Sequence, residues 1–316
     1  MSLAVEKPAV AGRALRPSGR RGGVKGSHRR AALWLIGPFI VLYLFVYAAP
    51  IGYSIVQSLF SRRNVTSLGF GGVQTVFVGF GNYAVVLTDP AFWASMGRIA
   101  LLGLVQVPVM LVFAVALALL IDSKIGRGSR IFRLAFFVPY AVPGVIAGIL
   151  WSFLYGPTLS PIVKGFAGLG ITVDFLGRDA VLWAIANIIT WTFAGYNMLI
   201  ALSALQAVPA ELYEAARIDG ANEWQIATQI KLPHLRPALV LSGTLSIIGT
   251  IQIFTEPQTL AAVSPFITSK YVPTMAALNA AFGANNFGLA AATSVVIAVI
   301  AGILSVIYYR ITSVKA

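Results

Sequence analysis

Side chains that could perform covalent, metal or acid–base chemistry are scarce in this sequence. The 316 residues include no cysteine and two histidines, His28 and His234, so thiolate ligands and cysteine nucleophiles are excluded, and a histidine-based metal site is nearly excluded. No stretch has the form G-x-x-x-x-G-K-[ST], which cradles nucleotide phosphates. We therefore expect no catalytic residue, no metal site and no cofactor bound by this chain.

Charged and polar side chains with a recognisable spacing gather instead in residues 206–236, which we call the connector. Pro209 suits the first turn of a helix, and Glu214 lies close enough to that end to favour the positive pole of the helix dipole. Gly220, directly after Asp219, suits the left-handed position that follows a helix. The spacing predicts a short helix that begins near Pro209 and ends at Asp219.

A second short helix is predicted immediately after this turn. Asn222 and Gln225 have the spacing of a capping box, and Pro233 and Pro237 mark the entry to the next apolar stretch. The small pair Ala215–Ala216 would let another surface come close. We interpret the connector as a helix–turn–helix at the membrane face that docks a soluble partner, because nothing in a bilayer requires it.

A further set of polar side chains lies inside otherwise apolar stretches. Asn187 and Trp191 are four residues apart, as are Gln252 and Glu256, so each pair would share a helix face. Polar groups in a membrane are costly and mark function by default, although Glu256 lies at a predicted helix end where water lowers the cost. Amides, a carboxylate and aromatic rings suit the hydroxyls and apolar CH faces of a sugar. We expect these four residues to line a substrate pathway.

The elements that must position these residues are membrane-spanning helices. Hydrophobic residues make up 58% of the chain and charged residues 10%, against about 25% charged in a typical soluble domain, which excludes a cytosolic globular protein. A spanning helix needs about 20 mostly apolar residues, and none of the long apolar stretches alternates as a barrel strand would. Six stretches qualify: Ala31–Phe60, Ile99–Ile121, Leu134–Tyr155, Ala180–Leu205, Leu239–Thr255 and Phe287–Tyr309. We predict an all-α polytopic membrane protein with about six transmembrane helices.

The basic residues predict the orientation of these helices. The formal net charge is +13, and most of the 23 lysines and arginines fall in segments that share a side with the N-terminus. By the positive-inside rule both termini are then cytosolic, as is the connector between the fourth and fifth helices. The membrane topology explains the positive charge, so we expect no nucleic-acid partner. Residues 1–30 are expected to form a disordered basic cytosolic tail, followed by one transmembrane domain over residues 31–316 whose first apolar run is too long for a cleaved signal peptide.

Small and aromatic residues inside the apolar stretches have structural interpretations. Gly144 and Gly148 have the spacing that lets two helices pack closely. Trp151, Tyr155 and Trp183 are expected to form part of an aromatic belt at the membrane surface. We expect these five residues to serve packing and membrane anchoring.

The connector resembles a loop of a known protein family. It contains the pattern E-A-A-x3-G-x9-I-x-L-P, at Glu214-Ala215-Ala216, Gly220 and Ile230-Lys231-Leu232-Pro233. This pattern resembles the cytosolic loop of permease subunits in binding-protein-dependent ABC importers, and the resemblance covers nearly the whole chain after residue 31. Two further stretches look like the carbohydrate-uptake branch of that family, as in maltose-type importers: Phe77–Tyr83 with Asp89–Trp93 after it, and Phe136–Tyr140.

The resemblance implies a role for each residue of the pattern. The short helix would insert into a cleft of an ATP-hydrolysing subunit, where Glu214 would face a basic residue and Gly220 would allow the turn. The implied coupling residues are Glu214, Ala215, Ala216, Arg217, Asp219 and Gly220. A charge-assisted contact in such a cleft contributes about 1.5–3 kcal/mol. If Glu214 stabilised only its own helix, it would contribute about 0.3–1 kcal/mol.

The resemblance also implies an assembly. The chain would form a translocation pathway with a second permease subunit and receive a sugar, such as a neutral di- or oligosaccharide, from an extracytoplasmic solute-binding protein. Two ATP-binding subunits, which carry the ATP and Mg²⁺, would drive transport, so the chain would not be an enzyme by itself. It would be a multi-pass protein in the lipid bilayer of a bacterial or archaeal cytoplasmic membrane.

Three alternatives stay open at this point. An anionic solute such as glycerol phosphate would favour a basic residue within a span, and the six stretches contain none. An ion-coupled secondary transporter would usually show inverted repeats and buried acids on broken helices, and Glu256 is a marginal acid. An intramembrane enzyme would need positioned acid, base or metal groups, whereas His28 and His234 fall in expected cytosolic segments. An ATP-driven sugar importer is the leading hypothesis.

Overall fold

The computed structural model is mostly helical and describes residues 24–64, 73–123 and 129–312. The chain divides into two compact units, the first of which ends at Tyr53. The first unit consists of α1 (Val24–Tyr43), the π-helical turn η1 (Leu44–Ala48) and the first part of α2 (Ala49–Gln57). α1 already includes the last residues of the tail that we expected to be disordered, and the rest of that tail lies outside the described residues.

The first predicted span is confirmed as one apolar helical run, Leu33–Gln57, long enough to cross a membrane. Pro38 and Pro50 lie within it and do not end it. A proline lacks an N–H and crowds the carbonyl four residues earlier. Pro50 lies two residues after the end of η1, and a π turn at that point loosens the regular hydrogen-bond ladder, so the run continues through the proline.

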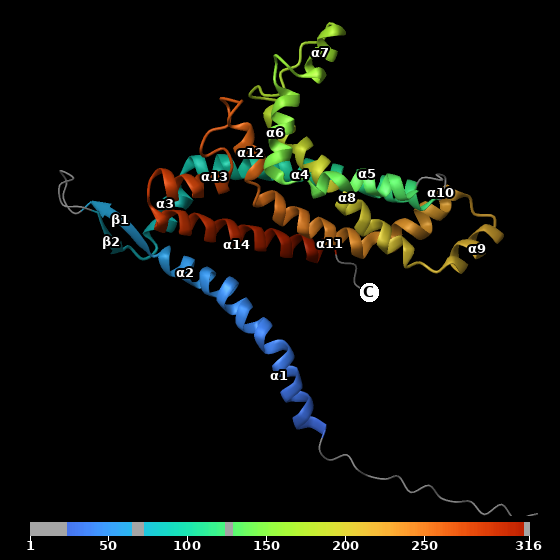
Figure 1. The fold of residues 1–316 in the computed structure, drawn as a ribbon, viewed down its shortest axis with the longest axis horizontal. Coiled ribbons are helices and arrows are strands. Elements are labelled where there is room, and N and C mark those ends of the chain that lie inside the picture. The colour runs from blue at the N-terminus through green and yellow to red at the C-terminus, as the bar shows by residue number, and fades with distance from the viewer. Residues whose placement is uncertain (1–23, 65–72, 124–128, 313–316) are drawn as a thin grey trace, which may run out of the picture. The chain divides into compact units, whose positions relative to one another are not determined.

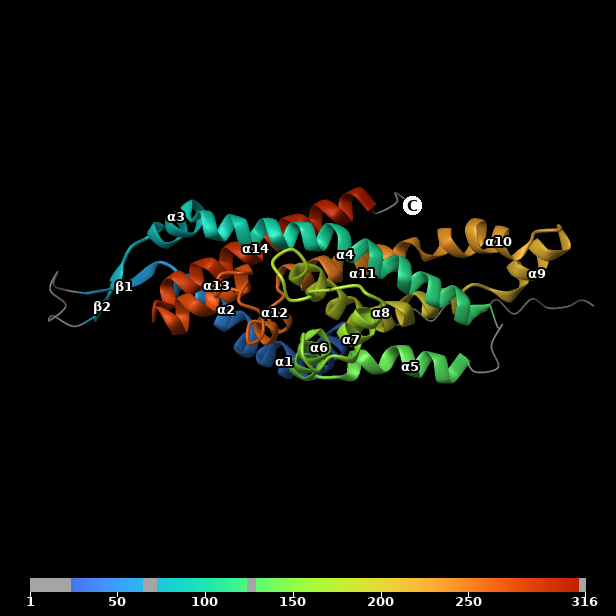
Figure 2. The same cartoon turned by 90° about the horizontal axis from the view of Figure 1, so that it is seen from above.

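Four further segments, all in the second unit, are long and apolar enough to cross a membrane. They are α4 (Pro90–Asp122), α8 (Val181–Gln206), the run Glu223–Leu260, which contains α11 (Leu232–Ile251), and α14 (Phe287–Thr312). They confirm the second, fourth, fifth and sixth predicted helices. α4, α8, α11 and α14 lie side by side, and the connector lies at one end of them (Figures 1 and 2).

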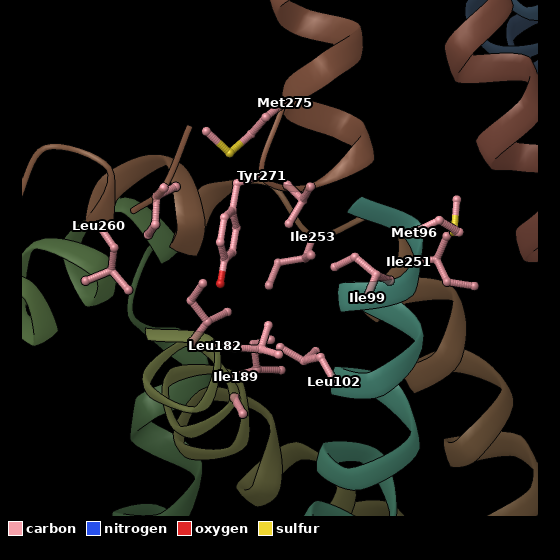
Figure 3. Packing of buried hydrophobic residues seen from close by; sticks show 14 of the residues in the cluster. Met96, Ile99, Leu102, Leu182, Ile189, Ile251, Ile253, Leu260, Tyr271 and Met275 are labelled. Atoms are coloured by element: carbon pink, nitrogen blue, oxygen red, sulfur yellow. The ribbon is translucent and has the colours of Figure 1, made fainter. Parts of the chain in front are cut away.

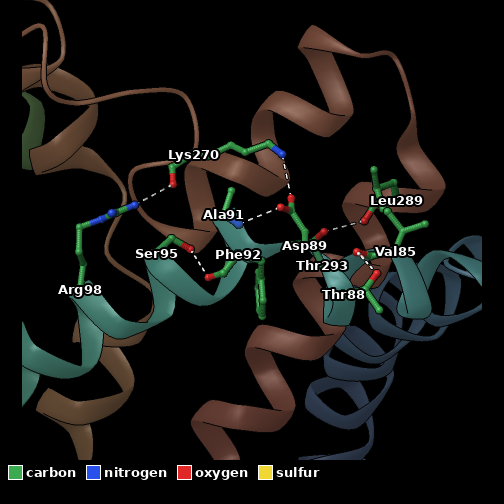
Figure 4. Close-up of polar contacts among 10 residues, drawn as sticks. All are labelled: Val85, Thr88, Asp89, Ala91, Phe92, Ser95, Arg98, Lys270, Leu289 and Thr293. Atoms are coloured by element: carbon green, nitrogen blue, oxygen red, sulfur yellow. Dashed lines mark hydrogen bonds and ion pairs between the residues drawn. The ribbon is translucent and has the colours of Figure 1, made fainter.

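α4 begins earlier than predicted because its start is capped. The Asp89 carboxylate accepts a hydrogen bond from the Ala91 N–H at 2.8 Å. It also accepts one from Lys270 Nζ at 2.8 Å (Figure 4), and this bond holds the pKa of Asp89 below its ordinary value. Arg98, which precedes the predicted stretch Ile99–Ile121, is therefore helical, and its Nε donates to the Tyr271 carbonyl at 2.9 Å. A helix of 33 residues is about 50 Å long and exceeds a hydrocarbon core of about 30 Å, which leaves room for Arg98 outside that core.

The third predicted span is broken. It consists of α5 (Ser129–Ala141) and α6 (Gly144–Tyr155), which meet at 97° (Figure 1). Pro143 lies at the corner, and a proline disfavours the helical conformation in the residue before it. The described residues thus contain five candidate spans, or six if this bent pair counts as one.

α6 packs closely on α12 (Thr255–Leu260), as the spacing of its glycines predicted. A Cβ atom on Gly148 would overlap the Thr259 side chain, and one on Gly144 would lie 3.4 Å from Thr255. Only glycine at position 148 therefore permits this approach.

The fifth predicted span begins much earlier than expected. α10 (Glu223–Ile226) and the π turn η2 (Ala227–Lys231) continue directly into α11. Pro233 and Pro237 therefore lie within the helical run and not at its entry. Pro233 follows η2 as Pro50 follows η1, which gives the same physical explanation for an uninterrupted helix.

The same span also ends earlier than expected. α11 stops at Ile251, and α12 starts a new helix at Thr255. Pro257 explains the break, because a proline is tolerated in the first turn of a helix but not in its interior. The prediction that Gln252 and Glu256 share one helix face is therefore wrong.

Two clusters of buried apolar residues hold the second unit together. The larger cluster (Figure 3) joins α4, α8, α14 and the segments that follow α11, and it buries Leu102, Ile188 and Leu260 completely. The smaller cluster joins α4, α8 and α11, with Met198 and Leu235 fully buried. The second cluster lies on the connector side, so the connector rests on a packed body.

An antiparallel hairpin is an addition to the predicted all-α fold. Asn82 Nδ2 fixes it by donating to the carbonyls of Ser58 and Phe60 at 2.8 and 2.7 Å. The hairpin and its helical neighbours at the end opposite the connector (Figure 1) are β1 (Phe60–Asn64), β2 (Val73–Phe77), α3 (Gly81–Thr88), α13 (Pro273–Leu278) and the π turn η3 (Asn279–Gly283). A further short helix, α7 (Pro161–Gly168), follows α6.

Candidate functional site

The connector begins with α9 (Ala210–Ile218), and its end has the geometry that the sequence predicted. The Gly220 N–H donates to the Arg217 carbonyl at 3.1 Å, and the Ala221 N–H donates to the Ala216 carbonyl at 2.9 Å. These two bonds form a Schellman motif. Gly220 has a φ of +85°, a left-handed conformation that costs other residues about 1–2 kcal/mol, so the predicted need for glycine is confirmed.

The turn after α9 is held by local polar bonds. Asn222 Oδ1 accepts from the Gln225 N–H, and Gln225 Oε1 accepts from the Asn222 N–H, both at 2.8 Å, so the predicted capping box is confirmed. Arg217 also forms an ion pair with Glu223 at 2.9 Å, but the two side chains are 55% and 66% exposed. Exposed pairs contribute about 0.2–1 kcal/mol, so the backbone caps define this turn.

The residues with an implied coupling role lie on the outer surface of the connector. Ala216 is half-buried, and the exposed members are Glu214, Ala215, Arg217, Asp219 and Gly220. Large apolar side chains are exposed beside them, with Ile218 at 86% and Trp224 at 76%. Carboxylates next to exposed apolar groups are typical of a surface that binds another protein. Docking of an ATPase here stays a prediction.

The inner side of the connector contains an ion pair that the sequence analysis missed. Lys231 Nζ lies 2.6 Å from Asp122 Oδ2, and the two side chains are 9% and 17% exposed. The same Nζ lies 5.3 Å from the ring centre of Tyr213 in α9. Burial raises the pKa of the Tyr213 hydroxyl above its ordinary value, and the Asp122 carboxylate adds to the shift. The available signal was a single acid, Asp122, at the end of a long apolar stretch.

A central cavity of about 410 Å³ lies between the helices of the second unit. This volume falls within the ~300–1,000 Å³ typical of small-ligand sites. α4, α5, α8, α11, the break after α11 and α12 all contribute to its wall. Its polar and aromatic members include Gln106, Tyr140, Tyr196, Asn197, Gln252 and Glu256. The cavity thus gathers residues from helices that are distant in sequence.

Two buried amides of the cavity wall have free acceptor oxygens. Gln106 Nε2 donates to Thr190 Oγ1 at 3.2 Å, and Asn197 Nδ2 donates to the Phe193 carbonyl at 3.0 Å. Gln106 Oε1 and Asn197 Oδ1 have no hydrogen-bond partner among the described residues. A buried acceptor without a partner is costly, and both oxygens are closed off from solvent in this conformation. A ligand hydroxyl would reach them once the side chains turn toward the cavity. Neither amide was predicted from the sequence.

Aromatic rings form another part of the cavity wall. The rings of Tyr140 and Tyr196 are stacked, with centroids 4.7 Å apart and planes 17° apart, and Phe193 meets Tyr140 edge-on at 5.8 Å. Flat aromatic faces beside amide acceptors match a molecule that has both apolar faces and hydroxyl groups. The cavity is therefore suited to bind a polyhydroxylated ligand.

The four predicted pathway residues fall into two places. Gln252 and Glu256 both line the central cavity, although they belong to different elements. Asn187 and Trp191 do not line it. At 3.6 residues per turn, positions two apart are nearly opposite, so Asn187 and Trp191 face away from the cavity residue Ile189 that stands between them in sequence.

Asn187 and Trp191 belong to a separate aromatic cluster. Asn187 Nδ2 donates to the Tyr155 hydroxyl at 2.8 Å, and the Trp191 and Trp151 rings meet edge-on at 5.8 Å. Tyr155 is only 4% exposed, so its predicted place in a membrane-surface belt is wrong. Contact of any of the four pathway residues with a solute stays a prediction.

A family model supports the resemblance seen in the connector. The model described as "Binding-protein-dependent transport system inner membrane component" matches residues 110–313. The match includes the connector and most of the cavity wall.

Two transport proteins and one solved structure are similar to this chain. The lactose transport system permease protein LacF of Rhizobium radiobacter is 33% identical over 229 residues, which cover 71% of this chain and 74% of that protein. The trehalose transport system permease protein SugA of Mycobacterium tuberculosis is 28% identical over 308 residues, 94% and 93% of the two chains. A bacterial ABC transporter involved in the import of the acidic polysaccharide alginate contains a chain that matches with a TM-score of 0.77 at 18% identity, over 91% of this chain and 97% of that one. That last similarity concerns the fold alone.

Proposed function

The chain belongs to the family of binding-protein-dependent transport system inner membrane components, and on this premise we propose that it is a permease subunit of an ATP-driven sugar importer. It forms the translocation pathway together with a second permease subunit. An extracytoplasmic solute-binding protein delivers the sugar, and two ATP-binding subunits supply the energy. The assembly resides in a bacterial or archaeal cytoplasmic membrane, with the connector on the cytosolic side.

The observation that carries this proposal is the exposed connector on a chain without a nucleotide-binding loop of its own. α9 presents Glu214 outward, and Gly220 closes the helix with a tight turn. A cationic residue in a cleft of the ATP-binding subunit is the natural partner of Glu214, and the small Ala215 lets the two surfaces approach. ATP and Mg²⁺ are held by that subunit.

The solute that best fits the central cavity is a neutral sugar. Gln106 and Asn197 can offer acceptor oxygens to hydroxyl groups once their side chains turn toward the cavity, and Tyr140 and Tyr196 offer flat faces to the CH surface of a sugar ring. Glu256 is the one charged group among the described residues of the wall, and a carboxylate repels anionic solutes. Since two similar proteins are named for lactose and trehalose transport, we propose a disaccharide or short oligosaccharide.

Uptake by the reconstituted assembly tests this function. Vesicles that contain both permeases and the ATP-binding subunits, with the binding protein on the outer side, are given ATP inside and a panel of sugars outside. We expect uptake of one or a few neutral saccharides that requires both ATP and the binding protein. Uptake driven by a proton or sodium gradient alone would instead support an ion-coupled transporter. Preference for a phosphorylated solute would contradict the choice of a neutral sugar.

A further inference from the structure

Asp122 occupies a position where its charge is unfavourable without a partner. It is the last residue of α4, and the C-terminal end of a helix is the negative pole of its dipole. Its side chain is 17% exposed, so hydration compensates little of this repulsion. Lys231, which is itself 9% exposed, supplies the opposite charge at 2.6 Å. Each residue of this pair thus depends on the other.

A buried ion pair of this kind fixes how two segments contact each other more than it increases the free energy of unfolding. The loss of one partner leaves an uncompensated buried charge and is strongly destabilising, whereas replacement of both by apolar groups is often neutral. The arrangement specified here is the contact between the end of α4 and η2, the π turn that leads into α11. π turns occur frequently at functional sites, and Lys231 is the last residue of this one.

Tyr213 brings α9 to the same place. Its ring centre lies 5.3 Å from Lys231 Nζ, within the distance of a cation–π contact. Its hydroxyl is buried and has no hydrogen-bond partner in the described part of the chain, so the ring is held by packing and by the cation. Glu214, the next residue, is exposed on the outer surface of α9. The docking face and the buried contact are therefore adjacent on one short helix.

We propose that the Asp122–Lys231 pair and the Tyr213 ring above it, together called the anchor, couple the movement of α9 to the cytosolic ends of α4 and α11. Asp122, Lys231 and Tyr213 act as positioning residues, since none of them contacts the ATP-binding subunit or the solute in this account. The anchor rests on the proposed function, because it explains how a movement of α9 that the ATP-binding subunits cause would reach α4 and α11.

The test is a double-mutant cycle in the complete assembly. The variants are Asp122→Asn, Lys231→Met and the two combined, and the readout is the amount of solute transported per ATP hydrolysed. Lys270→Met is the matched control, because it makes the same substitution in a more exposed lysine–aspartate pair, with Asp89, that lies outside the connector. We expect each single variant to lower this ratio about tenfold, a factor within the range of coupling between contacting residues, and the double variant to recover most of it. The control keeps the wild-type ratio.

Either of two results overturns the anchor: single variants that retain the wild-type ratio, or a double variant whose loss equals the product of the two single losses. Should a single variant fail to assemble, Tyr213→Leu and Tyr213→Phe replace it, because neither leaves a buried charge. We expect the leucine variant to lower the ratio and the phenylalanine variant to preserve it, since the hydroxyl has no partner. Equal ratios in these two variants contradict the proposal.

Failure of the anchor and failure of the proposed function give different results. If the wild-type assembly shows no ATP-dependent uptake, the function is wrong. The anchor is then tested by spin labels at Leu120 and Glu211, both exposed, which report the distance from α4 to α9 in the assembly. The anchor predicts one narrow distance that broadens in Lys231→Met and narrows again in the double variant. An unchanged distribution in all variants excludes it.

Discussion

The connector and the central cavity are built from contacts of different range. In the connector, Gly220, Asn222 and Gln225 bond to residues a few positions away. The cavity takes Gln106 and Glu256 from helices that are far apart in the sequence. Local bonds form whenever the short segment folds, whereas the cavity exists only when several helices pack correctly. Substitutions in the two regions should therefore separate the delivery of energy from the binding of solute.

The largest effect that separates the two regions is expected for Glu214→Lys. A charge-assisted contact contributes about 1.5–3 kcal/mol, and reversal of the charge adds repulsion, so we expect transport to fall by about 100-fold or more. Membrane insertion and solute affinity should not change, because Glu214 is exposed and remote from the cavity wall. Copurification with the ATP-binding subunits and uptake in vesicles are measured together. A variant that copurifies and transports normally would remove Glu214 from the docking surface.

The next largest effect is expected on the cavity side, for Gly148→Leu. A side chain at this position overlaps Thr259 and pushes α6 away from α12, which carries Glu256. Overpacking of this kind destabilises by about 1–3 kcal/mol, so thermal unfolding should occur at lower temperature while ATPase docking persists. Gly97→Ala is the control, since an added Cβ there has nothing within 4 Å. Equal unfolding temperatures for the two variants would show that α6 and α12 do not pack as described.

A smaller, specific effect is expected for the buried acceptors. Asn197→Leu removes an oxygen that has no partner among the described residues and that we propose to accept from a solute hydroxyl. Loss of one hydrogen bond of typical strength, about 1 kcal/mol, should weaken the apparent affinity for sugar by about fivefold. Asn187→Ala, which lies outside the cavity, serves as the comparison and also tests the pathway prediction made from sequence. If Asn187→Ala weakens sugar affinity more than Asn197→Leu, the solute passes on the other side of α8.

The smallest effect is expected for Asn222→Ala in the connector. Loss of an N-cap side chain costs about 1 kcal/mol, and the remaining caps at Gly220 and Gln225 still form the turn. Amide hydrogen exchange at Gln225, whose N–H loses its acceptor on Asn222, should become faster by about fivefold, with little change in solute affinity. Unchanged exchange at Gln225 would mean that the capping box does not determine the turn.

The features that could be predicted from the sequence are those that depend on local contacts or on composition. Gly220 and the Asn222–Gln225 box were identified because their partners are local and their residue types are restrictive. The long apolar helices were identified because a bilayer demands length and composition alone. The family was recognised through spacing within the connector, which is again a local pattern.

What could not be predicted depends on tertiary packing. Gln106 and Asn197 are ordinary amides until their nitrogens find partners and their oxygens do not. The Asp122–Lys231 pair joins two positions with several helices between them in sequence. The break before Glu256 was missed because Pro257, which explains it, was not considered as the start of a new helix.

The central claim is that the connector lies on the cytosolic side of the membrane and that the ATP-binding subunits cover it there. The chain has no native cysteine, so Ala216→Cys in α9 provides a single labelling site for a membrane-impermeant thiol reagent. We predict labelling from the cytosolic side only, and protection from labelling once the ATP-binding subunits are bound. Labelling only from the outer side, or labelling that the bound ATP-binding subunits leave unchanged, would contradict the proposed coupling through the connector.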